Sequence, residues 1–172
     1  METPPTNLPL RPSARVFLVN KREELLMFNE PQGGRSFWFT PGGGINESES
    51  ASAAAVRELR EETGIDVTEM QLGPMVATSG GDTEYRDEAL WSMDSFFFLR
   101  VDEVDIDYSG MEDYEAGQIQ SHRWWDLADI ETTSDTVLPL QLTSLVRRLL
   151  AGESWSEPIH LPWWHDPQRT ES

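Results

Sequence analysis

Residues 41 to 65 read PGGGINESESASAAAVRELREETGI and place several acidic side chains within one short stretch. Glu58, Glu61 and Glu62 are spaced i, i+3 and i+4, so on a helix they would share one face. Three carboxylates on one face repel each other, and a divalent cation would remove that conflict. Mg²⁺ and Mn²⁺ prefer hard oxygen ligands of this kind. The spacing alone fits a metal site and fits equally a solvated acidic helix with glutamate–arginine pairs.

Two further features accompany the glutamates. Arg57 stands one position before Glu58 and could pair with Glu49 or Glu61, which would hold the carboxylates in fixed rotamers. Glycines 42 to 44 predict a turn before the helix. Their backbone could approach a metal ion or a phosphate closely, and a glycine carbonyl could be a further ligand.

The elements that must position these residues are predicted from local patterns. Residues 48–63 are rich in Ala, Leu, Glu and Arg and predict a helix, capped by Ser48 or Ser50 and ended by a left-handed Gly64. Leucines four, three and four residues apart predict a second helix over 137–151. Short β-branched and aromatic runs predict strands at 14–20, 24–28, 36–40, 72–79, 90–101 and 119–125. This order predicts an α/β domain with helices packed on a curved sheet.

The complete pattern is Gly43, five residues, Glu49, seven residues, Arg57-Glu58-Leu59, one residue, Glu61-Glu62, one residue, Gly64-Ile65. It resembles the Nudix box, the motif of the Nudix (MutT-related) hydrolase family, at every defined position and spacing. The resemblance implies the Nudix fold, an α/β/α sandwich with a mixed curved β-sheet between helices. It also implies that water, assisted by Mg²⁺ or Mn²⁺, cleaves the pyrophosphate linkage of a nucleoside diphosphate linked to another group X. Nucleotide sugars, dinucleoside polyphosphates and nucleoside di- or triphosphates are the candidate substrates.

The resemblance also implies roles for single residues. Glu58, Glu61 and Glu62 would ligate the metal, with help from the Gly43 carbonyl, while Glu49 and Arg57 would order the loop and the helix. The general base stays open between Glu58 and an acid of a later loop. Glu115, nine residues before Trp124, is the leading loop candidate, and Glu112 and Asp113 compete with it.

Residues outside the box are weaker candidates for substrate binding. Arg35 and Arg86 lie in predicted loops and could contact phosphates, although an isolated surface arginine usually has no specific role. Trp38 could stack on a nucleobase, as could Tyr85 and Trp91, but its place in a short strand favours the core. The alternative to an enzyme is a non-catalytic nucleotide-sensing or interaction module on a Nudix fold. Such modules often lose box glutamates, whereas all of them are present here.

The composition of the whole chain limits the classes of molecule that the protein can bind. Its 13 basic and 31 acidic residues give a formal charge of −18, which would repel a nucleic-acid polymer. A small nucleotide stays compatible if divalent cations bridge the like charges. There is no cysteine, no apolar run of roughly 18 residues and no secretory signal, so we expect a cytoplasmic protein without membrane partners. We expect a flexible leader over 1–11, a Nudix hydrolase domain over 12–151 and an aromatic C-terminal tail over 152–172. The tail would dock on the domain or form a homodimer contact.

Overall fold

The computed structural model describes residues 7–32, 34–85, 88–102, 105–107, 109 and 121–164. Within this part of the chain the strands are β1 (Leu10–Val19), β2 (Leu25–Gln32), β3 (Arg35–Phe39), β4 (Gly42–Gly44), β5 (Ala77–Tyr85), β6 (Glu88–Arg100), β7 (Ser121–Trp125), β8 (Thr136–Leu138) and β9 (Ile159–His160). The helices are α1 (Ala51–Thr63), α2 (Glu69–Leu72), α4 (Leu127–Thr132) and α5 (Leu142–Leu150).

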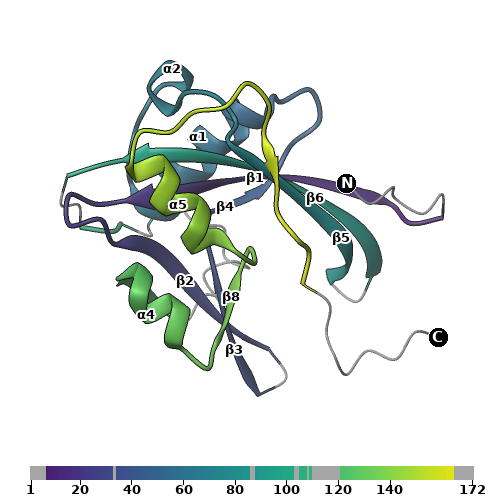
Figure 1. The fold of residues 1–172 in the computed structure, drawn as a ribbon. Helices are drawn as coiled ribbons and strands as arrows, with labels where there is room; N and C mark the ends of the chain where they lie inside the picture. The colour runs from purple at the N-terminus through teal and green to yellow at the C-terminus, as the bar shows by residue number, and fades with distance from the viewer. Residues whose placement is uncertain are drawn as a thin grey trace.

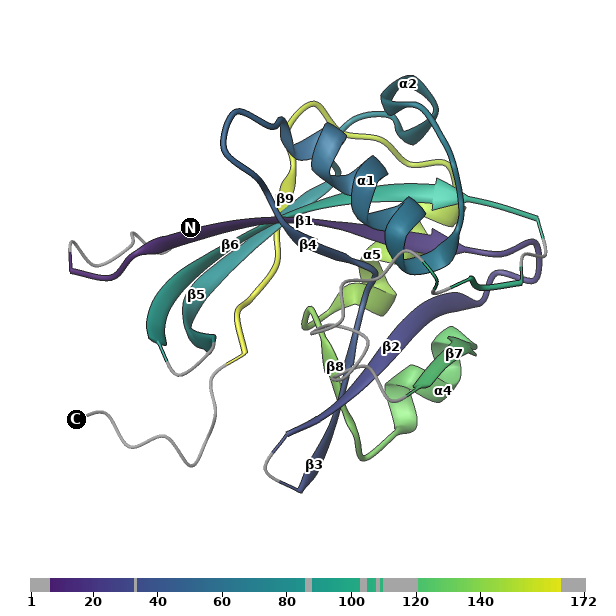
Figure 2. The same ribbon diagram turned by 180° about the vertical axis from the view of Figure 1, so that it is seen from behind.

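These strands form one mixed sheet in the order β8-β3-β2-β1-β6-β5-β9, with β4 added to β1 and β7 to β2. The central pair, β1 and β6, is parallel, as are β3 with β8 and β5 with β9, and the other pairs are antiparallel. The sheet is strongly curved, and its β5–β6 arm diverges from its β2–β3 arm (Figure 1). Helix α1 covers one side and α5 the other, as the reverse view also shows (Figure 2). The predicted mixed curved sheet between helices is therefore confirmed.

Strand β1 supplies side chains to the hydrophobic clusters on both sides of the sheet, because successive residues of a strand point to opposite faces. Val16 and Leu18 pack in the cluster that contains Ala54, Ala55 and Leu59 of α1. The alternate residues, Phe17 and Val19, belong to the cluster on the α5 side with Leu142, Leu145 and Val146. Ala54 and Ala55 are fully buried, and their small side chains let the helix axis approach the sheet closely.

The ends of α1 follow local chemistry. Ser50 is the N-cap and its side chain accepts a hydrogen bond from the Ala53 N–H. Gly64 ends the helix with a left-handed φ of 74°, and its N–H donates to the Arg60 carbonyl. Both predicted caps are confirmed, with Ser50 rather than Ser48 in the capping role. The helix consequently begins at Ala51, three residues later than predicted.

Three sequence predictions differ from the structure. The strand expected at 72–79 begins only at Ala77, because Thr68 and Gln71 form a capping box that starts the short helix α2. The helix expected at 137–151 begins at Leu142, because residues 136–138 pair with β3 as strand β8. The glycines expected to form a turn are extended instead, and residues 42–44 pair with β1 as strand β4.

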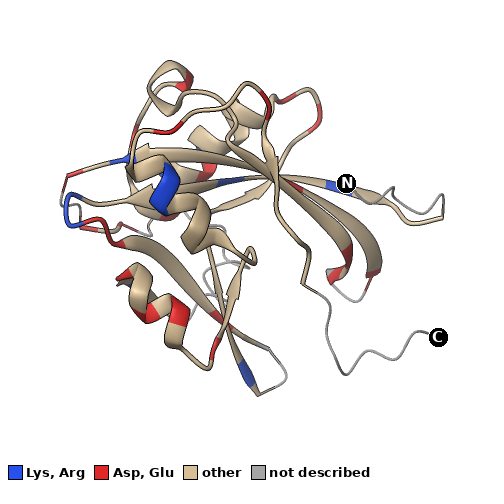
Figure 3. Ribbon diagram, viewed as in Figure 1, with Lys and Arg blue, Asp and Glu red and all other residues tan. Residues whose placement is uncertain are grey.

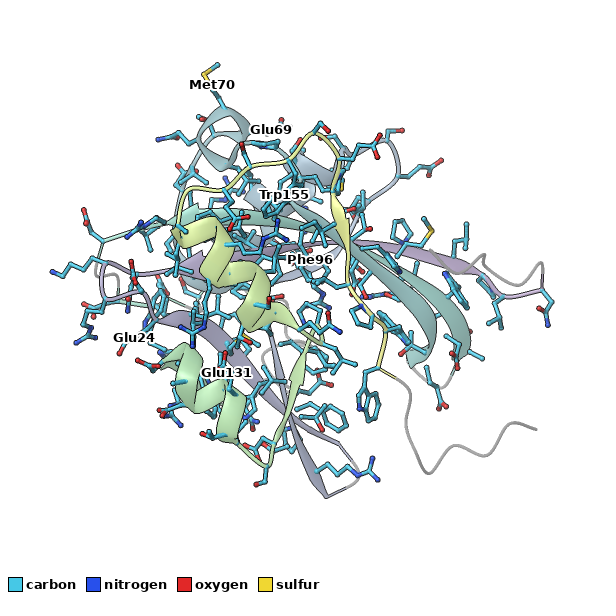
Figure 4. The ribbon with its side chains drawn as sticks, in the orientation of Figure 1. Glu24, Glu69, Met70, Phe96, Glu131 and Trp155 are labelled. Carbon is cyan, nitrogen blue, oxygen red and sulfur yellow. The ribbon has the colours of Figure 1, made fainter. Side chains whose placement is uncertain are left out.

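The C-terminal segment packs on the domain up to residue 164. Strand β9 pairs with β5, and the Trp155 Nε1–H donates to the Val76 carbonyl at 2.8 Å. Trp155 and Phe96 lie on the same side of the sheet as α5 (Figure 4). Further along, Trp163 donates from Nε1 to the Asp82 carbonyl at 3.0 Å. Within the described residues, no helix is both long and apolar enough to cross a membrane.

Candidate functional site

The guanidinium of Arg57 is the centre of the site. Its Nε and Nη2 donate to the two carboxylate oxygens of Glu49 at 2.9 and 3.0 Å. Its Nη1 donates to Glu58 at 2.6 Å and to Glu61 at 3.2 Å. Nη2 also donates to the Gly44 carbonyl at 2.8 Å. We call these five residues the Arg57 cluster; they join the start of the box, strand β4 and helix α1 into one unit.

The charges of the Arg57 cluster stabilise each other. The hydrogen bond from Arg57 holds the pKa of the Glu49 carboxyl below its usual range, against the opposing effect of burial. The hydrogen bond to Glu49 and the neighbouring charge of Glu58 raise the pKa of Arg57. Glu49 and Arg57 are therefore both ionised at neutral pH. Both predicted partners of Arg57, Glu49 and Glu61, are confirmed.

Glu58 lies directly against the glycine strand. Its side chain is buried, and a Cβ added at Gly43 would stand 2.7 Å from the carboxylate carbon and 2.7 and 2.8 Å from its two oxygens. Only glycine leaves this space open. Because the antiparallel pairing of Gly43 with Ala14 fixes β4 against β1, the backbone cannot simply retreat.

Glu62 takes a different direction from the same face of the helix. Its carboxylate accepts a hydrogen bond from the Gly42 N–H at 2.6 Å, and the side chain is buried. Arg15, on the neighbouring strand β1, donates from Nη1 to the carbonyls of Thr40 and Gly42 at 3.1 and 3.4 Å. The glycine strand is thus held from the helix side by Glu62 and from the sheet side by Arg15.

The side chains present fit a divalent cation in their chemistry. Glu58 and Glu61 both reach the same nitrogen of Arg57, and hard carboxylate oxygens lie beside a glycine backbone. Among the described residues, however, no group of three or more His, Asp or Glu side chains is arranged around one point in space. Glu62 is oriented toward Gly42, whereas Glu58 and Glu61 share the Arg57 Nη1 donor.

The candidates outside the box are dispersed. Glu115 and Arg86, like Glu112 and Asp113, lie outside the described residues. The prediction of a loop at Arg35 is wrong, because Arg35 is the first residue of β3 and pairs with Gln32 of β2. Trp38 is 9% exposed and packs edge-on against Trp125, with ring centroids 5.1 Å apart, in the cluster on the α5 side. Trp38 therefore fills the core, the role that its strand position favoured. Trp91 is buried too.

Sequence reasoning missed the contribution of Arg15. Besides holding the glycine strand, Arg15 lies 3.7 Å from the Asp94 carboxylate of β6, and both side chains are largely buried. A signal was available, because an arginine within the apolar run ARVFLV of a buried strand must find a partner. The identity of that partner depends on the parallel register of β1 and β6, which a single sequence does not reveal.

Comparisons with known proteins agree with this geometry. The family model described as the NUDIX domain matches residues 9–145. Nudix hydrolase 5 of Arabidopsis thaliana is 43% identical over 70 residues, which cover 37% of this chain and 23% of the relative. The RNA pyrophosphohydrolase of Ectopseudomonas mendocina is 26% identical over 158 residues, which cover 83% of this chain and 96% of the relative. For the first three curated relatives, the matched part spans only 23% to 37% of their own length.

Solved structures share the fold. The E. coli dihydroneopterin triphosphate pyrophosphohydrolase matches with a TM-score of 0.58 at 20% identity, over 83% of this chain and 96% of that one. A bifunctional NMN adenylyltransferase/ADP ribose pyrophosphatase from Francisella tularensis, solved with AMP and a Mn ion, matches with a TM-score of 0.55 at 21% identity, over 86% of this chain and 43% of that one. The family model spans most of the chain, including helix α1 and the complete box, and the chain accordingly belongs to the Nudix family.

Proposed function

We propose that this protein is a metal-dependent pyrophosphohydrolase that cleaves the pyrophosphate linkage of a nucleoside diphosphate linked to a group X. The Arg57 cluster carries the proposal, because it holds the box carboxylates Glu49, Glu58 and Glu61 in fixed positions beside a glycine strand. Acidic side chains that are held in place beside a strand without side chains suit a phosphorylated substrate that binds through divalent cations. A pyrophosphohydrolase activity is also named for the relative that aligns over most of its length with this chain.

The proposed roles follow from the contacts. Glu58, Glu61 and Glu62, with the Gly43 carbonyl, would hold Mg²⁺ or Mn²⁺. When bound, such a cation neutralises the pyrophosphate and acidifies the attacking water. Arg57 and Glu49 position the carboxylates, since the guanidinium binds Glu49, Glu58 and Glu61 at once. Glu62 fixes β4 through the Gly42 N–H.

The reaction needs one proton acceptor and no covalent enzyme intermediate. The oxygen of water forms a bond to phosphorus while the bond from that phosphorus to the bridging oxygen breaks, which leaves two phosphate-bearing products. A carboxylate takes the proton from water. Glu58, buried against Gly43, and Glu115, which lies outside the described residues, are the two candidates.

A panel of nucleotides tests the proposal. Nucleotide sugars, dinucleoside polyphosphates and nucleoside di- and triphosphates are incubated with the protein in Mg²⁺ or Mn²⁺, and released phosphate compounds are measured. We expect turnover in at least one class, and we expect Glu61→Gln and Glu62→Gln to lower kcat/KM by about 100-fold or more, as loss of transition-state charge stabilisation does. Glu47→Gln is the matched control, because Glu47 lies at a position that the motif does not define and is exposed.

Two results would contradict the proposal. One is no turnover of any nucleotide with either metal. The other is equal turnover by wild type and both variants, which would remove the carboxylates from the reaction. Tight nucleotide binding without hydrolysis would favour the alternative, a non-catalytic sensing module on the same fold.

A further inference from the structure

A pocket of about 350 Å³ lies on the α5 side of the sheet, between α4, the segment from β8 to α5, and the end of the C-terminal segment. Its volume is within the range, about 300–1,000 Å³, in which proteins hold small ligands. Apolar side chains such as Val137 and Leu142 form much of the lining, and Trp164 adds an aromatic wall. Glu131, Asp135 and Gln141 supply polar atoms. This combination suits a flat, partly polar heterocycle.

The C-terminal segment builds the aromatic wall. Trp163 packs against Gly81 of β5 and donates to the Asp82 carbonyl, so the segment is fixed on one arm of the sheet. The next residue, Trp164, packs edge-on against Phe37 of β3, with ring centroids 5.2 Å apart and an interplanar angle of 81°. Two adjacent tryptophans thus connect the two arms and bring Trp164 to the pocket.

The charge of the pocket excludes phosphate. Its lining contains the carboxylates of Glu131 and Asp135 and no lysine or arginine among the described residues. Acidic residues also gather on the adjacent helix α4 (Figure 3). Glu131 is engaged by Arg147 of α5 at 3.3 Å. A phosphate group would be repelled here, whereas a ligand edge with N–H groups would be attracted.

Asp135 is held in place by the core. Its Oδ2 accepts a hydrogen bond from the Trp38 Nε1–H at 2.9 Å, and Trp38 is itself packed edge-on against Trp125. The carboxylate therefore keeps a fixed position while it retains further lone pairs as acceptors. Because Trp38 holds the Asp135 carboxylate in place, this carboxylate is suited to accept hydrogen bonds from the edge of a ligand.

One part of the pocket lining, the segment after β8, begins at the same end of the sheet as the segment that leads from β3 to the glycine strand. Strands β3 and β8 are parallel, and Phe39 pairs with Leu138, the residue before the pocket residue Pro139. The chain then runs from Phe39 to Gly43 in four residues, which span at most about 14 Å. The base of an extended nucleotide could therefore lie in the pocket while its pyrophosphate lies beside β4.

We propose that this pocket binds the nucleobase of the substrate and selects guanine. The role of this pocket in hydrolysis rests on the proposed function, whereas the binding of guanine to the pocket does not. A carboxylate accepts two N–H donors side by side, and guanine presents its N1–H and its N2 amino group on one edge. Adenine and cytosine place a ring nitrogen acceptor beside their amino group, and uracil flanks its N–H with two carbonyls. Each of these edges sets a lone pair against the carboxylate.

Binding of nucleosides to the full chain tests the inference without metal or hydrolysis. Guanosine, adenosine, cytidine and uridine are titrated in the presence of a chelator and followed by saturation-transfer NMR. We expect guanosine to bind roughly tenfold or more tightly than the others, the size expected for charge-assisted hydrogen bonds. Asp135→Asn should remove this preference, since an amide cannot accept both donors. Asp129→Asn is the matched control, because Asp129 pairs with Arg123 on the exposed side of α4 and does not line the pocket.

Variants of the aromatic wall complete the test. Trp164→Ala should weaken binding of all four nucleosides by roughly tenfold, and Trp164→Phe should restore most of it, as expected for stacking on a ring. Equal affinity for the four nucleosides, or an unchanged preference in Asp135→Asn, would overturn the inference. Guanosine binding without hydrolysis of any nucleotide would overturn only the proposed function. Hydrolysis without guanosine preference would overturn only the assignment of the pocket.

Discussion

The substitution Gly43→Ala offers a sharp test of the active-site geometry. A methyl group at this position would stand 2.7 Å from the carboxylate carbon of Glu58, where ordinary van der Waals contact begins near 3.4 Å. Gly43 has no positive φ, so the alanine backbone itself is unstrained. The strand is tied to β1 at Gly42, Gly43 and Gly44. The Glu58 carboxylate must therefore move by about 0.7 Å, the difference between the two distances.

This displacement would disturb the hydrogen bond between Glu58 and Arg57, which is already short. Glu58 accepts from Arg57 at 2.6 Å and is buried, so its carboxylate has little room to turn without losing this partner. A misplacement near 1 Å in an active site can lower the rate about 100-fold. We expect kcat/KM for pyrophosphate cleavage to fall by about 10- to 100-fold. Overpacking of this kind also destabilises a fold by about 1–3 kcal/mol.

Gly44→Ala is a control in the adjacent position. A methyl group there would meet only Arg11 Nη2, at 3.8 Å, which is an ordinary contact. Both variants are compared with wild type by Mg²⁺-dependent turnover of the best nucleotide from the panel and by urea denaturation. We expect Gly44→Ala to stay within a factor of about two of wild type. Wild-type turnover by Gly43→Ala, or an equal loss in both variants, would refute the reasoning from this close contact.

Three further predictions concern the support of the site. Arg57→Lys should lower the free energy of unfolding by about 1–3 kcal/mol in urea, because an ammonium cannot replace a guanidinium that binds Glu49 with two nitrogens; Arg100→Lys, at a half-exposed surface pair, should change it little. The depressed pKa of Glu49 contributes stability above the usual carboxyl value of 4.5 that is lost as the pH falls through its lower folded value, so Tm should decline more steeply below pH 4.5 in wild type than in Glu49→Gln. Leu59→Ala should cost about 2–5 kcal/mol in urea, because Leu59 is fully buried between α1 and the sheet. Met70→Ala should stay within about 0.5 kcal/mol, because Met70 projects into solvent (Figure 4).

Features fixed by neighbours in the sequence were predictable. Helix α1 was expected from its composition, and its caps at Ser50 and Gly64 were expected because capping depends on the residue at the end of the helix and on those within one turn. The pairing of Arg57 with Glu61 follows in the same way from a spacing of four residues. The bond to Glu49 spans eight residues and the turn before the helix, and it was expected from the charges alone.

Features that depend on strand pairing and other long-range contacts could not be predicted from the sequence. The extended conformation of residues 42–44 depends on pairing with β1, which lies about thirty residues away in the sequence. Glycine has no side chain, so these residues show no alternating pattern that would predict a strand. Asp135 acquires its position from Trp38, which lies 97 residues away. The wall formed by Trp164 depends on the contact of the tail with both arms of the sheet. A single sequence records none of these long-range contacts.

The balance of charge in the Arg57 cluster affects both the stability of the fold and the proposed binding of a metal ion. One guanidinium faces the carboxylates of Glu49, Glu58 and Glu61, so the acidic groups of this cluster outnumber its basic group. Glu58 is nearly inaccessible to water, which makes the remaining repulsion more costly than on an open helix. The fold tolerates this arrangement because Arg57 also binds the Gly44 carbonyl and locks the cluster to β4. In the proposed enzyme, this excess of carboxylates is the source of affinity for a divalent cation. A ligand that binds only the folded state returns its binding free energy as stability.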